Sequence, residues 1–374
     1  MKRAVLLGFL LLTSCAAPPE GPAPAASYPP AVILMIGDGA GVAYWSAAKL
    51  TANAPLAIEA FPVLGLVDTR SADDRITDSA AGGTAFASGI RTNNAMVGVA
   101  PDSTPVQTVL ELAESRDWAT GLVATSSLTH ATPAAFAAHV PSRNMHHEIA
   151  RQMAGQGIDV MLGGGRMYFA PEGGADGSLE RLTRDATYVD DARQFLALDP
   201  DTVQALVGLF AENHPGSAAD RSPSLPEMTD VALRVLEKDP DGFFLMVESS
   251  QIDWLGHENA LLPDVLAEVN DFDQAVRAAL RFHERRPNTL IIVVADHETG
   301  GLAVHPDRSG EFGAHYTTDR HTGELVPLFA VGPGAEQFGG IKENAEVGQL
   351  LLEIVGAAGA DRPLTGVLTE DGAR

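Results

Sequence analysis

The chain has a single cysteine, Cys15, among its 374 residues. One cysteine cannot form a disulfide within the chain, so the fold must be stable without cross-links. Basic residues are also scarce, because 25 Lys and Arg face 49 Asp and Glu and leave a net charge of −24. This excess, with no basic run, argues against an electrostatic interaction with nucleic acid. An anionic substrate would therefore need local positive charge, and metal ions are the obvious source.

The sequence also lacks an apolar run long enough to span a membrane as a helix. The run over residues 4–12 follows two basic residues and is typical of an export signal. The sequence Leu12-Thr13-Ser14-Cys15 is similar to a bacterial lipobox, which predicts a lipoprotein-type signal peptide over residues 1–14 and a lipid on Cys15. An ordinary signal peptide with an incidental cysteine is the alternative.

The residues after this signal predict how the folded part of the chain is connected to the membrane. Residues 15–30 are rich in Pro and Ala and predict an extended linker. We therefore expect an exported bacterial protein, periplasmic or at the cell surface, that touches the membrane only through lipid on Cys15.

What the sequence does contain is a series of short apolar runs separated by helical stretches. Hydrophobic residues make up 45% of the chain, enough for a large core. The alternation predicts an α/β fold with a doubly wound, mostly parallel central sheet and helices on both faces. Pro327 indicates that the last run lies at or near a sheet edge. The runs are residues 31–36, 121–125, 158–162, 243–247, 289–294 and 325–331, and helices are expected at 104–115 and 265–285.

The organisation expected from this pattern is a single catalytic α/β domain over residues 31–360. Polar composition between residues 176 and 230, with Pro215, Pro223 and Pro226 among its prolines, interrupts the alternation. We therefore expect an irregular insertion at about residues 170–230, lying over the site. Its function cannot be read from the sequence.

Residues 75–89 lead from a polar turn into small residues that favour a tightly packed helix. Ser79 lies where this helix should begin, so its hydroxyl faces unpaired backbone N–H groups and the positive end of the helix dipole. A phosphate can be held at such a position. The alternative is that Asp78 or Ser79 merely caps the helix.

Polar residues follow four of the apolar runs. Their carboxylates and imidazoles should meet at one edge, because the carboxyl ends of parallel strands lie together. A further pair, Asp253 and His257, is four residues apart and would share one helix face, where both can reach one ion. Alternatively, these two side chains only bind each other. The residues after the runs are Asp38, His130 and Thr132, Glu248, and Asp296 with His297.

Taken together, these motifs resemble the alkaline phosphatase family. They occur in the family's order between residues 38 and 323: Asp38 in Gly-Asp-Gly, Thr77-Asp78-Ser79-Ala80-Ala81, His130-Ala131-Thr132-Pro133, Arg143 in Ser-Arg-Asn, Glu248, Ile252-Asp253 with His257, Asp296-His297 with Thr299-Gly300, and His321-Thr322-Gly323. The resemblance implies a hydrolase of small phosphate monoesters that uses two zinc ions and one magnesium ion.

The resemblance also implies a role for each residue. Ser79 would be the nucleophile that becomes phosphorylated, and Arg143 would hold two phosphate oxygens. The first zinc would be bound by Asp253, His257 and His321, the second zinc by Asp38, Asp296 and His297, and magnesium by Asp38, Thr132 and Glu248, with His130 beside it. Oxygen donors suit magnesium and nitrogen-rich sets suit zinc.

Two features depart from the pattern of some family members. His130 and Trp254 stand where some members have Asp and Lys, which places the chain in a subgroup with less secure magnesium binding. The chain is short for the family, which leaves the usual dimer interface in doubt and a homodimer open. The remaining histidines are expected to be structural or solvated: His139, His146, His147, His214, His283, His305 and His315.

Two other functions compete with this prediction. A metal-dependent phosphodiesterase or nucleotide pyrophosphatase of the same superfamily would share the zinc ligands but usually has Thr as its nucleophile. A lipid-anchored protein that binds phosphate or metal without turnover is the second alternative. Ser79, Arg143 and the third metal set favour monoester hydrolysis.

Overall fold

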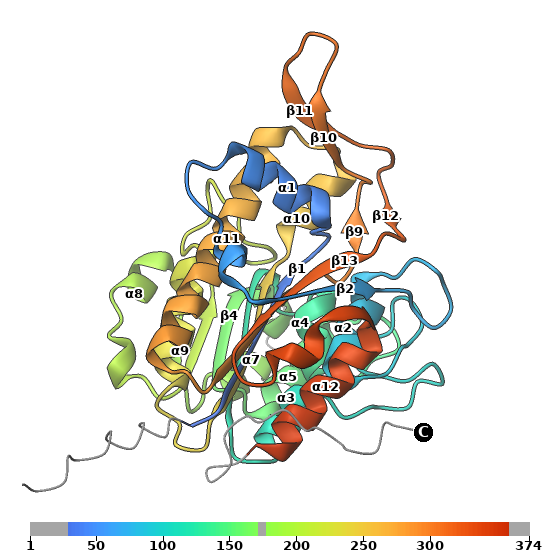
Figure 1. The fold of residues 1–374 in the computed structure, drawn as a ribbon. Coiled ribbons are helices and arrows are strands. Elements are labelled where there is room, and N and C mark those ends of the chain that lie inside the picture. Colours follow the sequence, from blue (N-terminus) through green and yellow to red (C-terminus); the bar gives the residue numbers. More distant parts are fainter. Residues whose placement is uncertain (1–28, 171–176, 359–374) are drawn as a thin grey trace, which may run out of the picture.

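The apolar runs form the centre of a ten-stranded sheet (Figure 1). The computed structural model describes residues 29–170 and 177–358. Strands β1 (Ala31–Gly37), β7 (Phe243–Ser249) and β8 (Thr289–Val294) are buried along their whole length because helices cover both faces of the sheet. The strand order is β14-β2-β13-β8-β1-β7-β3-β4-β6-β5. The other strands are β2 (Val63–Asp68), β3 (Ala119–Ser127), β4 (Val160–Gly164), β5 (Thr187–Val189), β6 (Leu206–Leu209), β13 (Val326–Val331) and β14 (Gly340–Glu343).

The sheet is mostly parallel, as the sequence predicts. Strand β13 runs antiparallel to its neighbours β2 and β8, and every other pair in this sheet is parallel. Two small antiparallel pairs lie beyond it. Strands β9 (Glu298–Thr299) and β12 (His321–Thr322) form one pair. Strands β10 (Ala303–Pro306) and β11 (Phe312–His315) form a hairpin that projects at the top of Figure 1.

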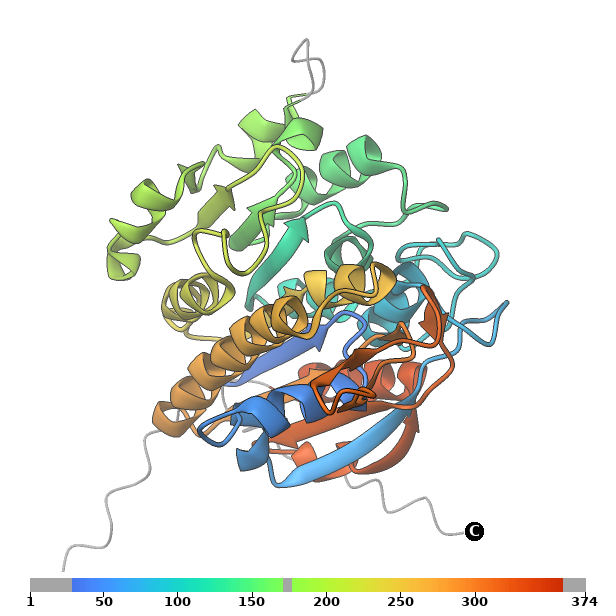
Figure 2. The ribbon, with the colours of Figure 1, turned by 90° about the horizontal axis from the view of Figure 1, so that it is seen from above.

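Helices form a layer on each face of the sheet (Figure 2). One layer is built around the long helix α11 (Leu262–Arg285), which packs against α1 (Val42–Thr51) and α9 (Leu225–Leu236). The other layer contains α2 (Ser79–Ser88), α3 (Val109–Glu114), α4 (Ala131–Ala137), α5 (His146–Gln156) and α12 (Asn344–Ala357). Shorter helices are α6 (Arg166–Phe169), α7 (Ser178–Leu182), α8 (Ala192–Leu196) and α10 (Gln251–His257), with 3₁₀ turns at Ala57–Ala60, Pro200–Thr202 and Ala335–Phe338.

Helix α3 is shorter than the predicted helix over residues 104–115. It begins only after Thr108, whose hydroxyl accepts a hydrogen bond from the backbone N–H of Glu111, while the Glu111 carboxylate accepts one from the N–H of Thr108. This reciprocal capping box fixes the helix start.

Strand β13, which contains Pro327, lies third from the edge of the ten-stranded sheet, so it is near an edge, as the sequence indicates, but not at it. Pro327 is opposite Leu66 of β2, but pairing with β8 begins only at Leu328. Pro327, which has no N–H to donate, therefore lies outside the stretch of β13 that pairs with β8.

The prediction of an irregular insertion at about residues 170–230 is wrong for the described part of that range, because two strands of the central sheet lie there. Strand β6 pairs with β4, and β5 pairs with β6 to form one edge of the sheet. Both strands are short, and β5 is exposed at Thr187, so their apolar pattern is weak. Residues 212–221, between β6 and α9, do reach the site described below.

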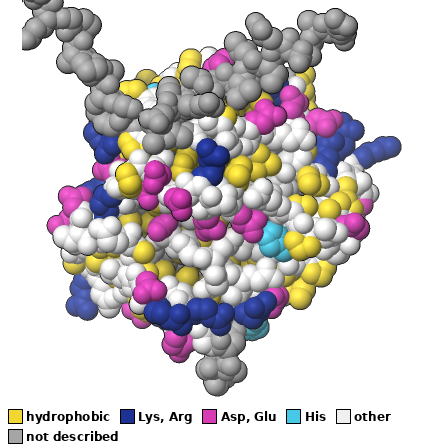
Figure 3. All heavy atoms as spheres, turned by 90° about the horizontal axis from the view of Figure 1, so that it is seen from below, with side chains coloured by type: hydrophobic (Ala, Val, Ile, Leu, Met, Phe, Trp, Pro, Cys, Tyr) yellow, Lys and Arg dark blue, Asp and Glu magenta, His cyan; other side chains and the backbone are white. Residues whose placement is uncertain are grey.

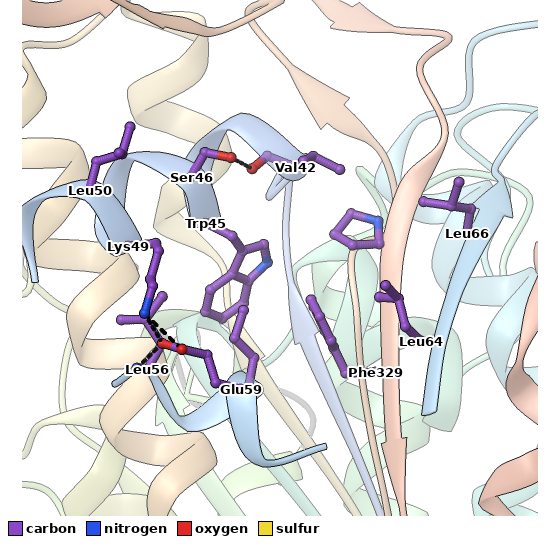
Figure 4. A pocket seen from close by; sticks show the side chains of 12 residues that line it. Val42, Trp45, Ser46, Lys49, Leu50, Leu56, Glu59, Leu64, Leu66 and Phe329 are labelled. Atoms are coloured by element: carbon purple, nitrogen blue, oxygen red, sulfur yellow. Dashed lines mark hydrogen bonds and ion pairs between the residues drawn. The ribbon is translucent and has the colours of Figure 1, made fainter. Parts of the chain in front are cut away.

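An apolar groove of about 640 Å³ lies between α1, β2 and β13 (Figure 4). Trp45 and Phe329 line it, with ring centroids 6.1 Å apart, and Lys49 pairs with Glu59 nearby. The groove contains none of the candidate site residues.

The surface agrees with the acidic composition. The face in Figure 3 shows Lys and Arg side chains in separate groups between Asp and Glu side chains. Among the described residues, no helix combines the length and the apolar character needed to traverse a bilayer.

Candidate active site

The candidate site lies at the carboxyl edge of four neighbouring strands, β8, β1, β7 and β3. Asp38 directly follows β1, and Glu248 lies near the end of β7, opposite Ile36 of β1. Asp296 follows β8, and His130 precedes α4 just after β3. Adjacent parallel strands therefore bring together groups that are far apart in the sequence.

Ser79 is the first residue of α2, a helix whose ten residues are all buried. Small residues let this helix approach its neighbours closely: a Cβ on Gly82 would lie 3.2 Å from the Asp296 carbonyl oxygen, and one on Gly83 would lie 3.1 Å from Cβ of Ala135. The Ser79 hydroxyl faces the site, with Oγ 3.3 Å from Nε2 of His297.

Asp78 joins the start of this helix to the predicted phosphate-binding arginine. Its Oδ1 accepts a hydrogen bond from the N–H of Ala81, so Asp78 caps the helix, while its Oδ2 lies 3.0 Å from Nη1 of Arg143. Nη2 of Arg143 lies 3.3 Å from Nε2 of His130. Because guanidinium only donates, this imidazole nitrogen accepts. Asp78 thus caps the helix, as the alternative interpretation of the sequence predicts, and the same residue contacts Arg143 at the candidate site.

The first cluster contains Asp253 and His257 of α10 and His321 of β12. The i,i+4 spacing places Nε2 of His257 3.3 Å from Oδ1 of Asp253, and pairing of β12 with β9 brings Nε2 of His321 to 3.4 Å from the same oxygen. Each imidazole uses Nδ1 on a backbone carbonyl, at Asp319 or Thr77.

This arrangement fits a bound cation. With Nδ1–H donating to a carbonyl in both rings, the two neutral imidazoles turn their Nε2 lone pairs toward each other across 3.1 Å. Such lone pairs repel unless a proton or a metal ion lies between them. Two imidazole nitrogens and one carboxylate are a common catalytic zinc set.

The second cluster contains Asp38, Asp296 and His297, all fully buried. Nε2 of His297 lies 3.5 Å from Oδ1 of Asp38 and 3.3 Å from Oδ2 of Asp296. Both Asp38 oxygens and Oδ2 of Asp296 are buried and accept no hydrogen bond from the described residues. Buried carboxylates are normally paired or bound to metal, so this set also fits a cation.

Gly39 is needed for the backbone to pass between the first two clusters. Its φ is +74°, and a Cβ there would lie 2.8 Å from Cα of Asp253 and 2.8 Å from Oγ1 of Thr299. Its N–H donates to Oδ1 of Asp296. A side chain at residue 39 would therefore push the carboxylates of Asp253 and Asp296 apart.

The third cluster contains Asp38 again, with His130 and Glu248. Oε2 of Glu248 accepts hydrogen bonds from the hydroxyls of Ser126 and Ser250, whereas Oε1 is buried without a partner in the described residues. Thr132, buried in the first turn of α4, lies two residues beyond His130. Two carboxylates and one imidazole are also the donors of the second cluster, but the hydroxyl of Thr132 would add a third oxygen here, as magnesium prefers.

Burial and mutual repulsion shift the pKa values of the clustered acids. Burial raises the pKa of Glu248 to about 7 and, with Asp253 nearby, raises that of Asp296 to about 6. Burial and the negative charges of Asp296, Asp253 and Glu248 raise the pKa of Asp38. Burial also opposes the charged form of Asp253, but a hydrogen bond from His321 and the nearby imidazoles lower its pKa overall. Without a cation, the acids of the three clusters together therefore carry more negative charge than the surrounding residues stabilise.

The imidazoles of His130 and His297 stay neutral. Burial lowers the pKa of His130 to about 3, with help from Arg143, and burial lowers the pKa of His297 well below its usual value. Neutral imidazoles are the form that binds metal.

Two residues support the site in ways that the sequence motifs did not reveal. Thr299 donates to Oδ1 of Asp253 and accepts from Nδ1 of His297, which links the first two clusters. The other is His214, whose ring lies 4.8 Å from that of Trp254 and 5.9 Å from that of His130. Thr299 belongs to a motif noted in the sequence, but its link to Asp253, like the position of His214, depends on long-range contacts that no local pattern marks.

A serine at a helix start beside three clusters with metal-ligand geometry, on a mostly parallel sheet, defines a metal-dependent hydrolase of phosphate esters. Comparison with known proteins agrees, because residues 30–315 match the family model described as alkaline phosphatase. The chain belongs to the alkaline phosphatase family, and it is a phosphomonoesterase.

Three relatives illustrate the similarity. Alkaline phosphatase 3 of Bacillus subtilis is 34% identical over 84% of this chain and 87% of its own length. Streptomycin-6-phosphate phosphatase of Streptomyces griseus is 34% identical over 92% and 95%. The solved structure of alkaline phosphatase from the Antarctic bacterium TAB5 is 37% identical, with a TM-score of 0.83, and covers 88% of this chain and 99% of its own. A variant of that protein with a histidine replaced by aspartate has Mg bound in its M3 site.

Proposed function

We propose that this phosphomonoesterase forms a phosphoserine on Ser79 and holds two zinc ions and one magnesium ion. The observation that carries the proposal is the position of the Ser79 hydroxyl, 3.3 Å from Nε2 of His297 in a buried cluster of two carboxylates and an imidazole. A nucleophile adjacent to a cation site is typical of metal-assisted phosphoryl transfer.

The donor chemistry supports the assignment of each ion. The first zinc would be held by Asp253, His257 and His321, the second by Asp38, Asp296 and His297, and magnesium by Asp38, Glu248 and Thr132, with His130 adjacent. When bound, the ions would supply Lewis acidity that lowers the pKa of the attacking hydroxyl and stabilises charge on the leaving oxygen.

The residues of the chain then bind and orient the ester. Arg143 retains free N–H groups for two phosphate oxygens, while Asp78 and His130 hold the guanidinium in place. Oγ of Ser79 loses its proton and attacks phosphorus, the bond to the leaving alcohol breaks, and the alcohol takes up a proton. Water then attacks the phosphoserine, which releases phosphate and restores Ser79. Two in-line displacements give retention at phosphorus.

One assay separates this function from its alternatives. Phosphate release from a simple monoester and a simple diester should be compared with zinc and magnesium present. We expect much faster monoester hydrolysis. Preference for the diester would favour a phosphodiesterase, and release from neither would favour a binding protein.

The third cluster predicts dependence on added magnesium. His130 provides a neutral imidazole where a carboxylate would add negative charge and an oxygen donor. We expect His130→Asp to lower the magnesium concentration for half activation by roughly 10-fold. Magnesium bound in a histidine-to-aspartate variant of the TAB5 enzyme supports this expectation.

The measurement is activity against magnesium concentration after dialysis, with zinc held constant. His283→Asp is the matched control, because His283 lies at the far end of α11 and, within residues 29–170 and 177–358, its ring bonds only to the Thr289 carbonyl. Identical titration curves for the parent protein and His130→Asp would show that residue 130 does not tune the magnesium site.

Cys15 predicts membrane anchoring, although it lies outside the described residues. We propose that Cys15 carries several acyl chains after export and that these anchor the protein at the membrane. Several chains are needed because a single acyl chain binds a membrane only weakly. Cys15→Ser should leave the protein unprocessed or release it from the membrane fraction. Cell fractionation and mass spectrometry of the mature N-terminus test this; a parent protein that is soluble and does not begin at residue 15 would contradict it.

A further inference from the structure

Residues 212–221 form one wall of the candidate active site. They connect β6 to α9 and lie against the carboxyl ends of β3 and β7. The amide of Gln251, at the start of α10, donates to the carbonyls of Pro215 and Gly216 at 2.9 and 3.1 Å. The segment is therefore attached to the helix that carries Asp253 and Trp254.

A buried ion-pair network holds the other end of this segment. Only 1% of the Arg221 side chain is exposed, and its Nη2 lies 2.8 Å from Glu268 and 2.7 Å from Asp271, both on α11. Its Nη1 donates to the carbonyl of Gly216, and Glu268 also accepts from the N–H of Ala218. A buried arginine with this many partners has one low-energy position, so the segment is fixed.

His214, in the middle of the segment, contacts two site residues. Its Nδ1 accepts a hydrogen bond of 3.0 Å from the N–H of Ser127, which keeps the ring neutral with its proton on Nε2. The ring meets those of Trp254 and His130 edge to face, at interplanar angles of 69° and 86°. Trp254 and His130 meet in the same way, at 6.1 Å and 78°. Each of the three rings thus packs against the other two.

The orientation of His130 depends on this packing. Its Nε2 accepts from Arg143, but Nδ1 is buried without a hydrogen-bond partner among the described residues. Histidines at metal sites are usually oriented by a hydrogen bond at their second nitrogen. Apart from the 3.3 Å hydrogen bond from Arg143, contact with the two neighbouring rings is what limits rotation of the imidazole.

We propose that His214 is a positioning residue for the third cluster, and that its ring holds His130 and Trp254 where magnesium can bind beside Asp38 and Glu248. The inference rests on the proposed function, because it concerns the ion assigned to that cluster. It gives residues 212–221 a role in ion affinity, with Arg221 as the anchor and His214 as the contact.

Three substitutions at residue 214 distinguish the contribution of the aromatic ring from that of the hydrogen bond with Ser127. His214→Ala removes both, His214→Asn keeps an oxygen that can accept from Ser127 but removes the ring, and His214→Phe keeps a ring but not the acceptor. Magnesium binding to the zinc-loaded protein should be measured by equilibrium dialysis. We expect roughly 10-fold weaker binding for the Ala and Asn variants. We expect the Phe variant to keep most of the affinity, at a lower melting temperature because the N–H of Ser127 loses its partner.

Controls and activity complete the test. His283→Ala removes another half-buried histidine with one backbone hydrogen bond, far from the site, and should leave magnesium affinity unchanged. Activity of the Ala and Asn variants should recover at saturating magnesium, since His214 acts on ion binding rather than on the ester. If His214→Ala does not fold, His214→Asn tests the same point with the Ser127 contact kept.

The outcomes are distinguishable. Parent-like affinity in a folded variant that lacks the ring would overturn the proposal. Retained affinity in His214→Asn with loss in His214→Phe would also overturn it, because the Ser127 contact would then set the affinity. A parent protein that binds zinc but no magnesium would overturn the metal assignment and this inference with it.

Discussion

Ser79→Ala should reduce monoesterase activity by about 10³-fold or more, because it removes the oxygen that attacks phosphorus while the three clusters stay intact. The substitution changes none of the imidazoles and carboxylates of the three clusters, and the Ala side chain fits the first turn of a helix already rich in Ala. Zinc content and melting temperature should therefore be close to those of the parent protein. The measurement is kcat with a simple monoester, together with metal analysis.

A labelling experiment tests the intermediate directly. Acid quenching of the parent enzyme with labelled inorganic phosphate should place the label on Ser79 and on no other residue. Ser88→Ala is the matched control, since Ser88 is buried at the opposite end of the same helix and donates only to the Thr84 carbonyl. Label on another residue, or full activity of Ser79→Ala, would exclude Ser79 as the nucleophile.

Removal of the metal ions should produce the second large effect, a loss of stability that grows as the pH rises. Without cations, the pKa of Glu248 is raised to about 7 and that of Asp296 to about 6. A raised pKa in the folded state means that stability is complete below the unfolded pKa and is lost as pH rises through the folded value. Together these two carboxylates should cost several kcal/mol of unfolding free energy, on the order of 3 kcal/mol each, as the pH rises from about 4 to about 7.

The metal-loaded protein should behave in the opposite way. Ligands must lose protons to bind metal, so stability should be steady or rise with pH over the same interval. Urea unfolding of both forms at several pH values provides the measurement. Glu114, whose pKa burial raises to about 7 away from the site, adds a background slope to both forms, and Glu114→Gln removes it. An apo-protein whose stability does not fall with pH would contradict the electrostatic account of the clusters.

Much of the site could be predicted because its residues follow recognisable local patterns. Asp38, Glu248 and Asp296 each come at or just after the end of a continuous apolar run, and such runs become central strands whose ends meet. The pair Asp253 and His257 needed only helical spacing. His321 was different: only the family resemblance marked it, because the pairing of β12 with β9 that places it has no local signal.

What the sequence could not show depends on contacts between distant segments. The position of Pro327 inside the sheet requires knowledge of where pairing with β8 begins. The strands of residues 187–189 and 206–209 are too short for their pattern to stand out from polar neighbours. His214 looked like an isolated histidine, because its neighbours Ser127, His130 and Trp254 come from other elements.

The order of the central strands also has a consequence for how the enzyme matures. Strand β1 lies between β7 and β8, and Gly39 just beyond it donates to Asp296, 257 residues further along the chain. The second and third clusters both need Asp38 together with residues from the C-terminal half. An N-terminal portion of the chain therefore cannot complete either cluster, and such non-local pairing is slow to form. Catalytic competence should appear only with the last cooperative step of folding, so recovery of activity can report complete folding.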